Sequence, residues 1–362
     1  SGAIDFDGSR MRYENIEPID DFSAGTLTIT GTSGDDVIDI VNGTVLANGT
    51  TPCPVACIEV RSPQFEKVIF ANKTSVTVNG AGGNDTITLN ITAAAVGLTS
   101  LTVQGGAGTN ALIVTNLASG VTYSSSDLTL AVEGFFWVSG NFAIRKTSAT
   151  VTLSDSSTVN ADVLTVGGDN VSAFVGVNGG TASEVGLSLT GVDFGLAILS
   201  DATRRWVSLQ ASATSAAFVG VTGLTLSAGT VDVKINRAAN DGTRVDYTPN
   251  TLNVPTGGAP VTLSMAGEDG ELLQASGNLT IDVSSFVTLT GNLGFSKSGT
   301  NLTAVGSAVT ASLTAGSANV TLANAQFGLQ ANENSVVFEL KNGTFSAVIS
   351  GLAAISASSV LV

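Results

Sequence analysis

Apolar and polar residues alternate along most of this chain. Examples are residues 26–30 (TLTIT), residues 75–78 (SVTV) and residues 278–283 (NLTIDV). Such alternation places every second side chain on the same face of a β-strand. Gly, Asn, Asp and Ser separate the runs, as is typical of turns, and few windows have the spacing of an amphipathic helix. We therefore expect an all-β protein with many short strands.

The first half of the chain contains a short internal repeat. Residues 76–80 (VTVNG) recur as residues 101–105 (LTVQG), and residues 86–89 (TITL) recur as residues 111–114 (ALIV), both at an offset of 25. A strand, a Gly-rich turn, a second strand and a return loop at this spacing indicate one coil of a parallel β-solenoid.

An earlier copy of this repeat places Gly31 before Gly80 at an offset of 49, close to two periods. Each coil of a solenoid buries its apolar face only by stacking on the next coil. We therefore expect residues 27–120 to form a short parallel β-solenoid with Gly/Asp turns. Residues 1–26 are expected to be an extended N-terminal segment and a candidate donated strand.

A second and longer repeat fills the remainder of the chain. Residues 128–132 (LTLAV) match residues 279–283 (LTIDV), and residues 138–142 (VSGNF) match residues 289–293 (LTGNL), both at an offset of 151. The pattern predicts an extended repetitive β-domain, and it leaves open whether this domain is a solenoid or an antiparallel sandwich.

Further along, the offset of the second repeat becomes shorter. Residues 189–196 (LTGVDFGL) match residues 322–329 (LANAQFGL) at 133, and the last segments match at 128 to 129. We therefore expect one complete β unit at residues 121–275 and a second, truncated unit at residues 276–362.

The beginning of the sequence reads as a continuation of its end. Residues 7–13 (DGSRMRY) match residues 241–247 (DGTRVDY), so that Ser1 aligns with Ile235, while the truncated unit aligns up to Val233. Either the chain is one period of a longer tandem array, or separate subunits join head to tail, each donating its N-terminal strand. Donated strands satisfy open sheet edges, and such a contact propagates into a filament unless it closes. The alternative is a common turn sequence that precedes a strand.

Composition excludes several functions. The 362 residues include no His, which excludes His-based acid/base catalysis and imidazole metal sites. Only 12% of residues are charged and the net charge is −15, so nucleic acid and anionic membranes are poor partners. No uninterrupted apolar run reaches the ~18 residues of a transmembrane helix. The carboxylates are scattered, whereas a glycosidase needs a pair of them, so we expect no enzymatic activity.

Two cysteines, Cys53 and Cys57, lie close together in the sequence. We expect a local disulfide rather than free thiols or a thiolate metal pair, and this favours an extracellular or cell-surface location. The sequence starts with Ser1 and shows no signal peptide, so we expect a chain that is processed or cut from something larger.

Three turns fit the calcium-binding nonapeptide Gly-Gly-x-Gly-x-Asp-x-apolar-x. Residues 80–88 (GAGGNDTIT) depart from it only at the second position, and residues 31–39 (GTSGDDVID) fit in part. Residues 105–113 (GGAGTNALI) keep all three glycines but have Asn110 in place of the acid. Such turns offer backbone carbonyl oxygens and a carboxylate, the hard ligands that calcium prefers.

These three segments resemble the repeats-in-toxin family of secreted calcium-binding β-rolls, in which stacked nonapeptides hold ions between turns. The resemblance implies Ca²⁺ as a cofactor, with these residues as ligands: Asp36, Asp85, Asn110, Gly31, Gly80 and Gly82. Two departures weaken it, because the copies follow one another at offsets of 25 or more rather than nine and Asn110 lacks the charge. The alternative is that these turns only close the coils.

The wider pattern resembles very large bacterial surface and adhesin-like repeat proteins. It rests on residues 15–19 (NIEPI), residues 83–88 (GNDTIT) and the repeated Phe-Gly-Leu segments. The resemblance implies export and a structural or adhesive role. We expect a structural building block of an extracellular filament, surface layer or giant adhesin, joined to copies of itself or to neighbouring repeats by β-strand continuity. The alternative is a calcium-dependent module that binds a carbohydrate or a cell.

Two aromatic segments are candidate carbohydrate sites. Residues 204–206 (RRW) are either a cation–π or sugar-stacking site or a solvated turn that leads into a strand, and we favour the turn. Residues 135–137 (FFW) are either a carbohydrate platform or a buried anchor, and we favour the anchor.

Overall fold

The protein is built almost entirely of β-strands, as the alternation predicts. The computed structural model describes residues 2–6, 9–13, 19–132, 136–177, 183–220, 224–283, 286–298, 301–316, 318–331, 335–349 and 354–361. Within these ranges, 25 strands belong to one hydrogen-bonded sheet and two form a separate hairpin. The all-β prediction is confirmed. No helix in the described ranges is long and apolar enough to span a membrane.

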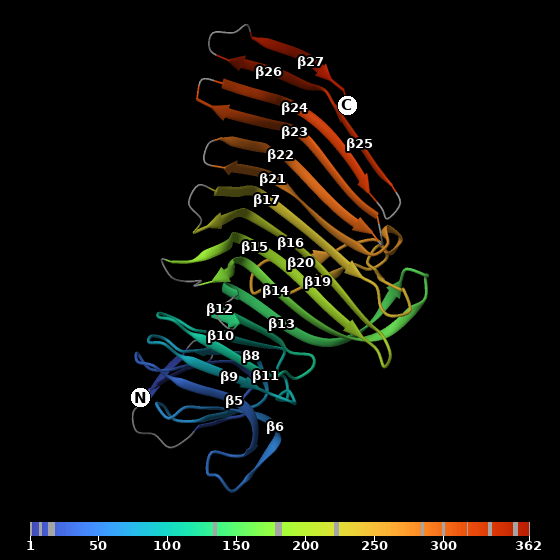
Figure 1. Ribbon diagram of the computed structural model, residues 1–362. Helices are drawn as coiled ribbons and strands as arrows, with labels where there is room; N and C mark the ends of the chain where they lie inside the picture. Colours follow the sequence, from blue (N-terminus) through green and yellow to red (C-terminus); the bar gives the residue numbers. More distant parts are fainter. Residues whose placement is uncertain are drawn as a thin grey trace.

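The strands fall into an N-terminal and a C-terminal group (Figure 1). The N-terminal strands are β1 (Gly2–Phe6), β2 (Ser9–Tyr13), β3 (Ile19–Asp21), β4 (Gly25–Thr30), β5 (Val37–Val45), β6 (Pro52–Arg61), β7 (Val68–Phe70), β8 (Lys73–Asn79), β9 (Thr86–Asn90), β10 (Ser100–Gln104) and β11 (Ala111–Asn116). The C-terminal elements are β12 (Thr122–Val132), β13 (Phe136–Leu153), β14 (Thr158–Val177), β15 (Val185–Ser200), β16 (Arg205–Val219), β17 (Leu224–Arg237), β18 (Val245–Asp246), β19 (Leu252–Val254), β20 (Val261–Leu263), the short helix η1 (Gly267–Asp269), β21 (Leu272–Val283), β22 (Val287–Ser298), β23 (Asn301–Ala315), β24 (Ala318–Ala331), β25 (Val336–Lys341), β26 (Gly343–Ile349) and β27 (Ile355–Val360).

The N-terminal strands form a parallel stack, a name used below for residues 19–120. β4, β8, β10 and β12 run parallel, with Leu27 beside Val76, Val76 beside Leu101, and Leu101 beside Tyr123. β5, β9 and β11 form a second parallel row, and β3 lies parallel to β7. The pairings of β4 with β8 and of β8 with β10 follow the two offsets of the sequence repeat. The first coil is longer because β6 inserts antiparallel between β5 and β7.

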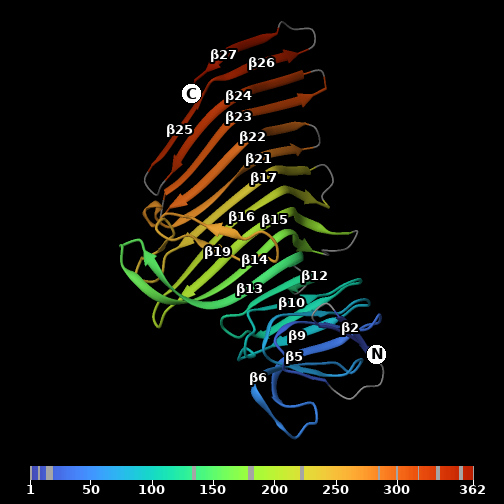
Figure 2. The same cartoon turned by 180° about the vertical axis from the view of Figure 1, so that it is seen from behind.

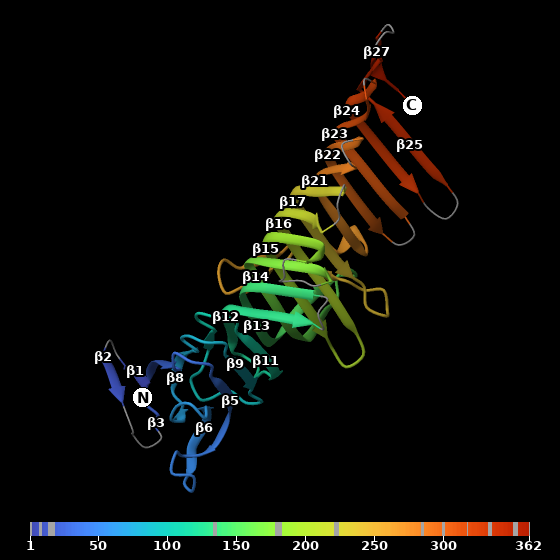
Figure 3. The same ribbon diagram turned by 60° about the vertical axis from the view of Figure 1, so that its left-hand side comes forward.

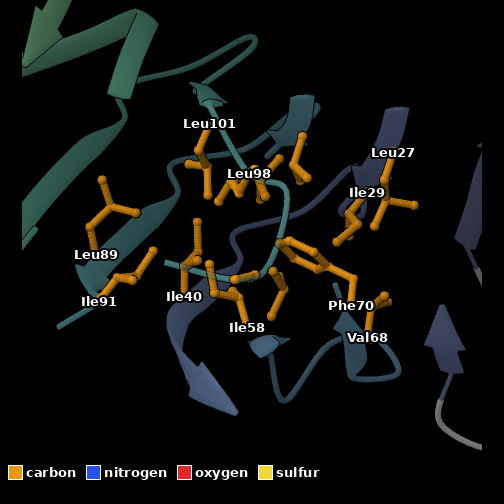
Figure 4. Close-up of a cluster of buried hydrophobic side chains, with 14 of the residues drawn as sticks. Leu27, Ile29, Ile40, Ile58, Val68, Phe70, Leu89, Ile91, Leu98 and Leu101 are labelled. Atoms are coloured by element: carbon orange, nitrogen blue, oxygen red, sulfur yellow. The ribbon is translucent and has the colours of Figure 1, made fainter. Parts of the chain in front are cut away.

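Apolar side chains fill the interior of the parallel stack (Figure 4). Every second residue of its strands points inward, as Leu27 and Ile29 of β4 and Val76 and Val78 of β8 do. Complete burial of one such side chain contributes about 1.5–3 kcal/mol. The coils are therefore held together mainly by this shared core, and they place their Gly/Asp turns above one another.

From β12 onward the long strands form one antiparallel sheet in which each pairs with the next from β12 to β17; β17 then pairs with β21, and the succession continues to β24. Both β25 and β26 pair with β24, and β27 pairs with β26. The question that the pattern left open is thereby answered, because this part is neither a solenoid nor a sandwich of two full sheets. Figure 3 shows the strands following one another from the N-terminal to the C-terminal end of the molecule.

The internal repeat is visible in the pairing registers of this sheet. Leu128 lies opposite Gly140 between β12 and β13, and Leu279 lies opposite Gly291 between β21 and β22. Both partners are shifted by the same offset as the matching sequence segments. The strands β21 to β27 therefore repeat β12 to β17, with β25 and β26 together taking the place of β16.

The long strands bend about halfway along their length, where β-bulges lie side by side. Register shifts occur between β13 and β14, between β14 and β15 and between β17 and β21, and again between β22 and β23 and between β23 and β24. Several bulge residues have left-handed backbone angles, such as Gly191 at φ 57° and its equivalent Asn324 at φ 53°. A bulge adds a residue to one strand and bends it. The bulges thus divide the strands that contain them into two straight halves.

One segment crosses the face of the sheet and is called the strap, defined as residues 238–271 (Figure 2). It contains β18, the β19–β20 hairpin and η1, and its strands contact β13 to β16. A second core lies beneath it and includes Trp206, Tyr247, Leu199 and Leu263. No described segment covers β21 to β27 in the same way, and many apolar side chains are exposed there. Examples are Leu273, Phe295, Val305, Val336, Val337, Phe338, Val348 and Ile355.

Candidate functional site

The β25 strand presents an open edge at the C-terminal end of the sheet. It pairs with β24 on one side, and no described strand pairs with its other side. Val336, Val337 and Phe338 are 70, 62 and 49% exposed. An unpaired edge with apolar side chains is a template for another strand. In the first unit, the equivalent half of β16 is covered on that side by β17, with Val207 opposite Arg237.

The N-terminal end of the sheet carries β1 and β2. β1 pairs antiparallel with β2 along its whole length, and Ile4 and Asp5 of β1 lie beside Ile29 and Thr28 of β4. Figure 1 shows the two ends of the sheet far apart, with β5 and β6 low in the picture and β25 to β27 at the top. The two ends of the hydrogen-bonded sheet therefore lie at opposite ends of the molecule.

The motif that the N-terminal segment shares with the strap has a defined role in the first unit. Thr243 accepts hydrogen bonds from the indole Nε1 of Trp206 at its backbone oxygen (3.1 Å) and at Oγ1 (3.2 Å). Arg204 binds Asp241 at 3.2 Å, and Val245 pairs with Leu153 of β13. The motif is thus a turn that attaches the strap to the sheet.

Trp206 corrects one expectation. Residues 201–204 form a turn, in which the backbone N–H of Asp201 donates to the oxygen of Arg204, but Trp206 is completely buried under the strap rather than part of a solvated turn. The guanidinium of Arg204 lies 4.9 Å from the centre of the Trp206 ring, so a cation–π contact exists within the protein. A buried ring offers no surface to a sugar. The side chains of residues 135–137 lie outside the described residues.

The predicted metal-binding turns lie above one another, and three of their side chains form a buried column. The backbone N–H of Asp36 donates to Oδ1 of Asp85 (2.8 Å), and the N–H of Asp85 donates to Oδ1 of Asn110 (2.8 Å). Asn110 in turn donates from Nδ2 to the oxygen of Gly106 (3.1 Å). The structure therefore brings Asp36, Asp85 and Asn110 together, each one coil from the next.

Gly31 and Gly80 are needed for close approach within this column. A Cβ atom at Gly31 would collide with the carboxylate of Asp36, and one at Gly80 would collide with the carboxylate of Asp85. Gly82 forms a parallel bridge with Ala107. The left-handed position next to Gly80 is taken by Ala81, at φ 75°. Glycine is therefore selected at positions 31 and 80 by space rather than by backbone angle.

The carboxylate oxygens of the column are largely occupied by the protein itself. Thr32 donates to both oxygens of Asp36, from its backbone N–H (2.7 Å) and from Oγ1 (3.0 Å). Oδ1 of Asp85 accepts from Asp36, whereas Oδ2 of Asp85 is buried without a hydrogen-bond partner among the described atoms. Calcium requires six to eight oxygen ligands. The column therefore fits a hydrogen-bond ladder better than a calcium site, and calcium binding stays a prediction.

The environment of Asp85 disfavours its charged form. Burial raises the pKa of this carboxyl; the N–H of Asp36 lowers it, and the nearby charges of Asp36 and Asp35 raise it further. The net pKa lies above the usual value. A neutral carboxyl would have a proton to donate from Oδ2, as Asn110 donates from Nδ2 one coil later.

A second column lies next to the first, and the sequence reasoning missed it. Asn84 donates from its backbone N–H to Oδ1 of Asp35 (2.7 Å), and Thr109 donates in the same way to Oδ1 of Asn84 (2.8 Å). The signal was present in the sequence, because an Asx pair occurs at both 35–36 and 84–85. Two adjacent ladders therefore join the coils at this corner.

A buried ion pair was also missed. Lys73 has no exposed side-chain surface, and its Nζ lies 2.7 Å from Oδ1 of Asp21 and 2.9 Å from Oγ of Ser23. Burial raises the pKa of Asp21, but hydrogen bonds from Lys73 and Ser23 outweigh it and hold the pKa below its usual value. The only signal in the sequence is a lysine at the start of a predicted strand, and Lys73 interrupts no apolar alternation.

Cys53 and Cys57 form a disulfide within β6, at the far end of the insertion that lengthens the first coil. The bond closes a short ring within β6, and Cys57 lies opposite Gly43 of β5 in the hairpin that these two strands form. Such a bond persists in oxidising compartments and is rare in reducing ones.

A shallow groove lies where the parallel stack meets the antiparallel sheet. Its described lining includes Asn116, Lys146, Asp162 and Arg205, and no aromatic side chain is among the described residues that line it. The lining thus combines aliphatic side chains, such as Val114, Leu117 and Ile198, with polar groups of both charges.

Comparison with known proteins gives no relative from which to transfer a function. No family model matches the chain, and neither a curated protein nor a solved structure does. Function must therefore be argued from the sheet, its two ends and the repeat.

Proposed function

We propose that this chain is a structural building block of an extracellular filament, surface layer or giant adhesin, in which units join head to tail by β-strand continuity. The observation that carries the proposal is the single sheet of 25 strands. Its hydrogen-bonded ladder passes from β1 through the parallel stack and the antiparallel sheet to β27. A strand added between two such units would extend the ladder without interruption.

The open edge and the repeat support this proposal together. The β25 edge exposes apolar residues where the equivalent half of β16 is covered by β17. Residues 1–13 of the N-terminal end carry the motif that follows β17 in the first unit. The open β25 edge at one end and the shared motif at the other end are therefore complementary.

The proposed extracellular location rests on the disulfide between Cys53 and Cys57 and on the weakly charged composition, which is rich in Thr, Ser and Gly. The mixed groove and the occupied carboxylates give the alternative, a calcium-dependent binding module, no comparable support.

Negative-stain microscopy of the tag-free chain at rising concentration tests the proposal. We expect filaments of uniform width that persist with a calcium chelator, because strand pairing needs no ion. Monomers at every concentration would overturn joining between separate chains. Filaments that disappear with the chelator would instead show that calcium at the Asp36 and Asp85 turns supports assembly.

A further inference from the structure

We propose that the β25 edge accepts β1 of a second copy in one defined register, with Val336 opposite Ala3 and Val337 opposite Gly2. We further propose that β2 occupies this edge of β1 in the isolated chain and must leave before two copies join. The inference rests on the proposed head-to-tail function. It specifies which strands form the contact between two copies and which strand blocks that contact in the isolated chain.

The position of β25 in the repeat follows from its pairing with β24. Phe327 lies opposite Leu340 between these strands, and Phe194 lies opposite Ala211 between β15 and β16. The two phenylalanines differ by 133 in number and their partners by 129, the same offsets that align the two units elsewhere in the sequence. β25 is therefore equivalent to the first half of β16, residues 207–212.

The covering strand in the first unit fixes the register. Between β16 and β17, Val207 lies opposite Arg237 and Ser208 lies opposite Asn236. Adding 129 to the β16 positions gives Val336 and Val337. A strand equivalent to the second half of β17 therefore fits against β25 in antiparallel orientation.

The same alignment identifies the missing strand. The shared motif aligns residues 7–13 with residues 241–247, which places Gly2 at the position of Asn236 and Ala3 at that of Arg237. β1 also lies antiparallel beside β4, just as β17 lies antiparallel beside β21. β1 thus has an antiparallel neighbour on its far side, as β17 has, although Ile4 and Asp5, which pair with β4, align with residues 238 and 239, just beyond the end of β17.

The near edge of β1 is already occupied within the same chain. β2 pairs with all of β1, with Gly2 opposite Tyr13 and Ala3 opposite Arg12. In the first unit the equivalent motif does not pair with β17; its Val245 pairs with Leu153 of β13 instead. The hairpin therefore caps the strand that the assembly needs, and joining exchanges β2 for β25.

In an unjoined chain the edge of β1 is closed by β2, while the edge of β25 stays open. β1 shares five pairs with β2 before assembly, whereas the register places only Gly2 and Ala3 opposite residues of β25, so the exchange gains nothing from backbone hydrogen bonds alone. The net gain comes from covering Val336, Val337 and Phe338, and it depends on the concentration of the second copy.

Cysteine pairs placed across the proposed contact test the register. Val336→Cys with Ala3→Cys should give cross-linked dimers and higher multimers under mild oxidation. The matched control, Val336→Cys with Ile4→Cys, is shifted by one residue, which turns the second thiol to the opposite face, and cross-linking should be lost. Equal cross-linking of both pairs, or of neither while filaments form, would overturn the register.

A disulfide that locks β1 to β2 tests whether β2 must leave before two copies join. Ile4→Cys with Met11→Cys joins β1 to β2 at a directly opposed pair. The oxidised variant should remain monomeric, and reduction should restore filaments, while the unmodified chain serves as a control for the effect of the reductant on the Cys53–Cys57 bond. Filaments from the oxidised variant would show that β2 does not need to leave β1.

The head-to-tail function and the β1–β25 exchange are contradicted by different results. If the unmodified chain forms no filaments, the head-to-tail function itself is wrong. If it forms filaments that the lock does not prevent, the function stands and the β1–β25 exchange is wrong.

Discussion

Asp85 shows how a single residue departs from the role that its motif suggests. The nonapeptide pattern suggests metal ligation by Asp36, Asp85 and Asn110, and the structure brings these three residues to one corner, each one coil from the next. The pattern did not predict that backbone N–H groups and Thr32 occupy most of the carboxylate oxygens. Hydrogen-bond partners that come from neighbouring coils are not written in the nine residues of the motif.

Asp85→Asn is expected to stabilise the protein at pH 7. The amide keeps the oxygen that accepts from Asp36 and adds a donor where Oδ2 now lacks a partner, which is worth about 1 kcal/mol. Because burial raises the folded-state pKa of Asp85, its charged form costs stability above that pKa, and acidification recovers it. Thermal unfolding should therefore show the largest gain at pH 7 and a shrinking gain towards pH ~4.

Asp35→Asn in the exposed column is the matched control and should change stability little, since an amide oxygen accepts from Asn84 equally well. Lower stability of Asp85→Asn at pH 7 would contradict the ladder. Stabilisation by calcium of the unmodified chain and not of the variant would show a cation site.

Asp21→Ala is expected to cost about 3 kcal/mol because it leaves the buried cation of Lys73 without its carboxylate. The double variant Asp21→Ala with Lys73→Met should cost less, since the charge is removed with its partner. The pKa of Asp21 lies below normal, so its contribution is present above the unfolded pKa and is lost as the pH falls through the folded value. Urea unfolding over a range of pH measures the free energy of unfolding of the unmodified chain, the single variant and the double variant. A double variant less stable than the single variant would contradict the ion pair.

At the scale of elements, the strap is the main difference between the two units. Alternation predicted the strands, and the offsets of the two repeats predicted which of them are equivalent. The strap was not predicted, because residues 238–271 have no repeat partner and their position depends on contacts with β13 to β16. Trp206 could not be assigned correctly from its charged neighbours alone, since the cover over its ring comes from Thr243, 37 residues later.

Trp206→Phe is expected to loosen the strap while keeping most of its core. The variant loses the indole donor to Thr243, which costs about 1 kcal/mol, whereas Trp206→Ala also opens a cavity and costs about 3–5 kcal/mol. Hydrogen exchange in residues 238–271 should accelerate in that order. Phe295→Ala, which alters an exposed ring, is the control. Unchanged exchange in Trp206→Ala would show that the strap is held elsewhere.

At the scale of the molecule, the continuous ladder predicts the repeat of an assembly. Neighbouring strands lie about 4.8 Å apart, so the succession from β1 to β27 gives an axial repeat on the order of 75 Å. Averaged filament images should show this spacing, with width variations where the strap lies. A repeat near half of this length would indicate that copies overlap side by side rather than join end to end.

The same ladder determines how such a fibre would bear load. Tension along the long axis would act on the hydrogen bonds between strands, pair after pair in series, so that the weakest junction sets the strength. β13 and β14 share a long row of paired residues, from Phe136 with Val175 to Thr152 with Thr158. β10 and β12 share only five pairs, from Ser100 with Thr122 to Gln104 with Ser126. β1 and β4 share only two pairs, Ile4 with Ile29 and Asp5 with Thr28. Under a pulling force this contact would therefore separate first, and the covalent chain between β1 and β4 would then act as a tether that lets it close again.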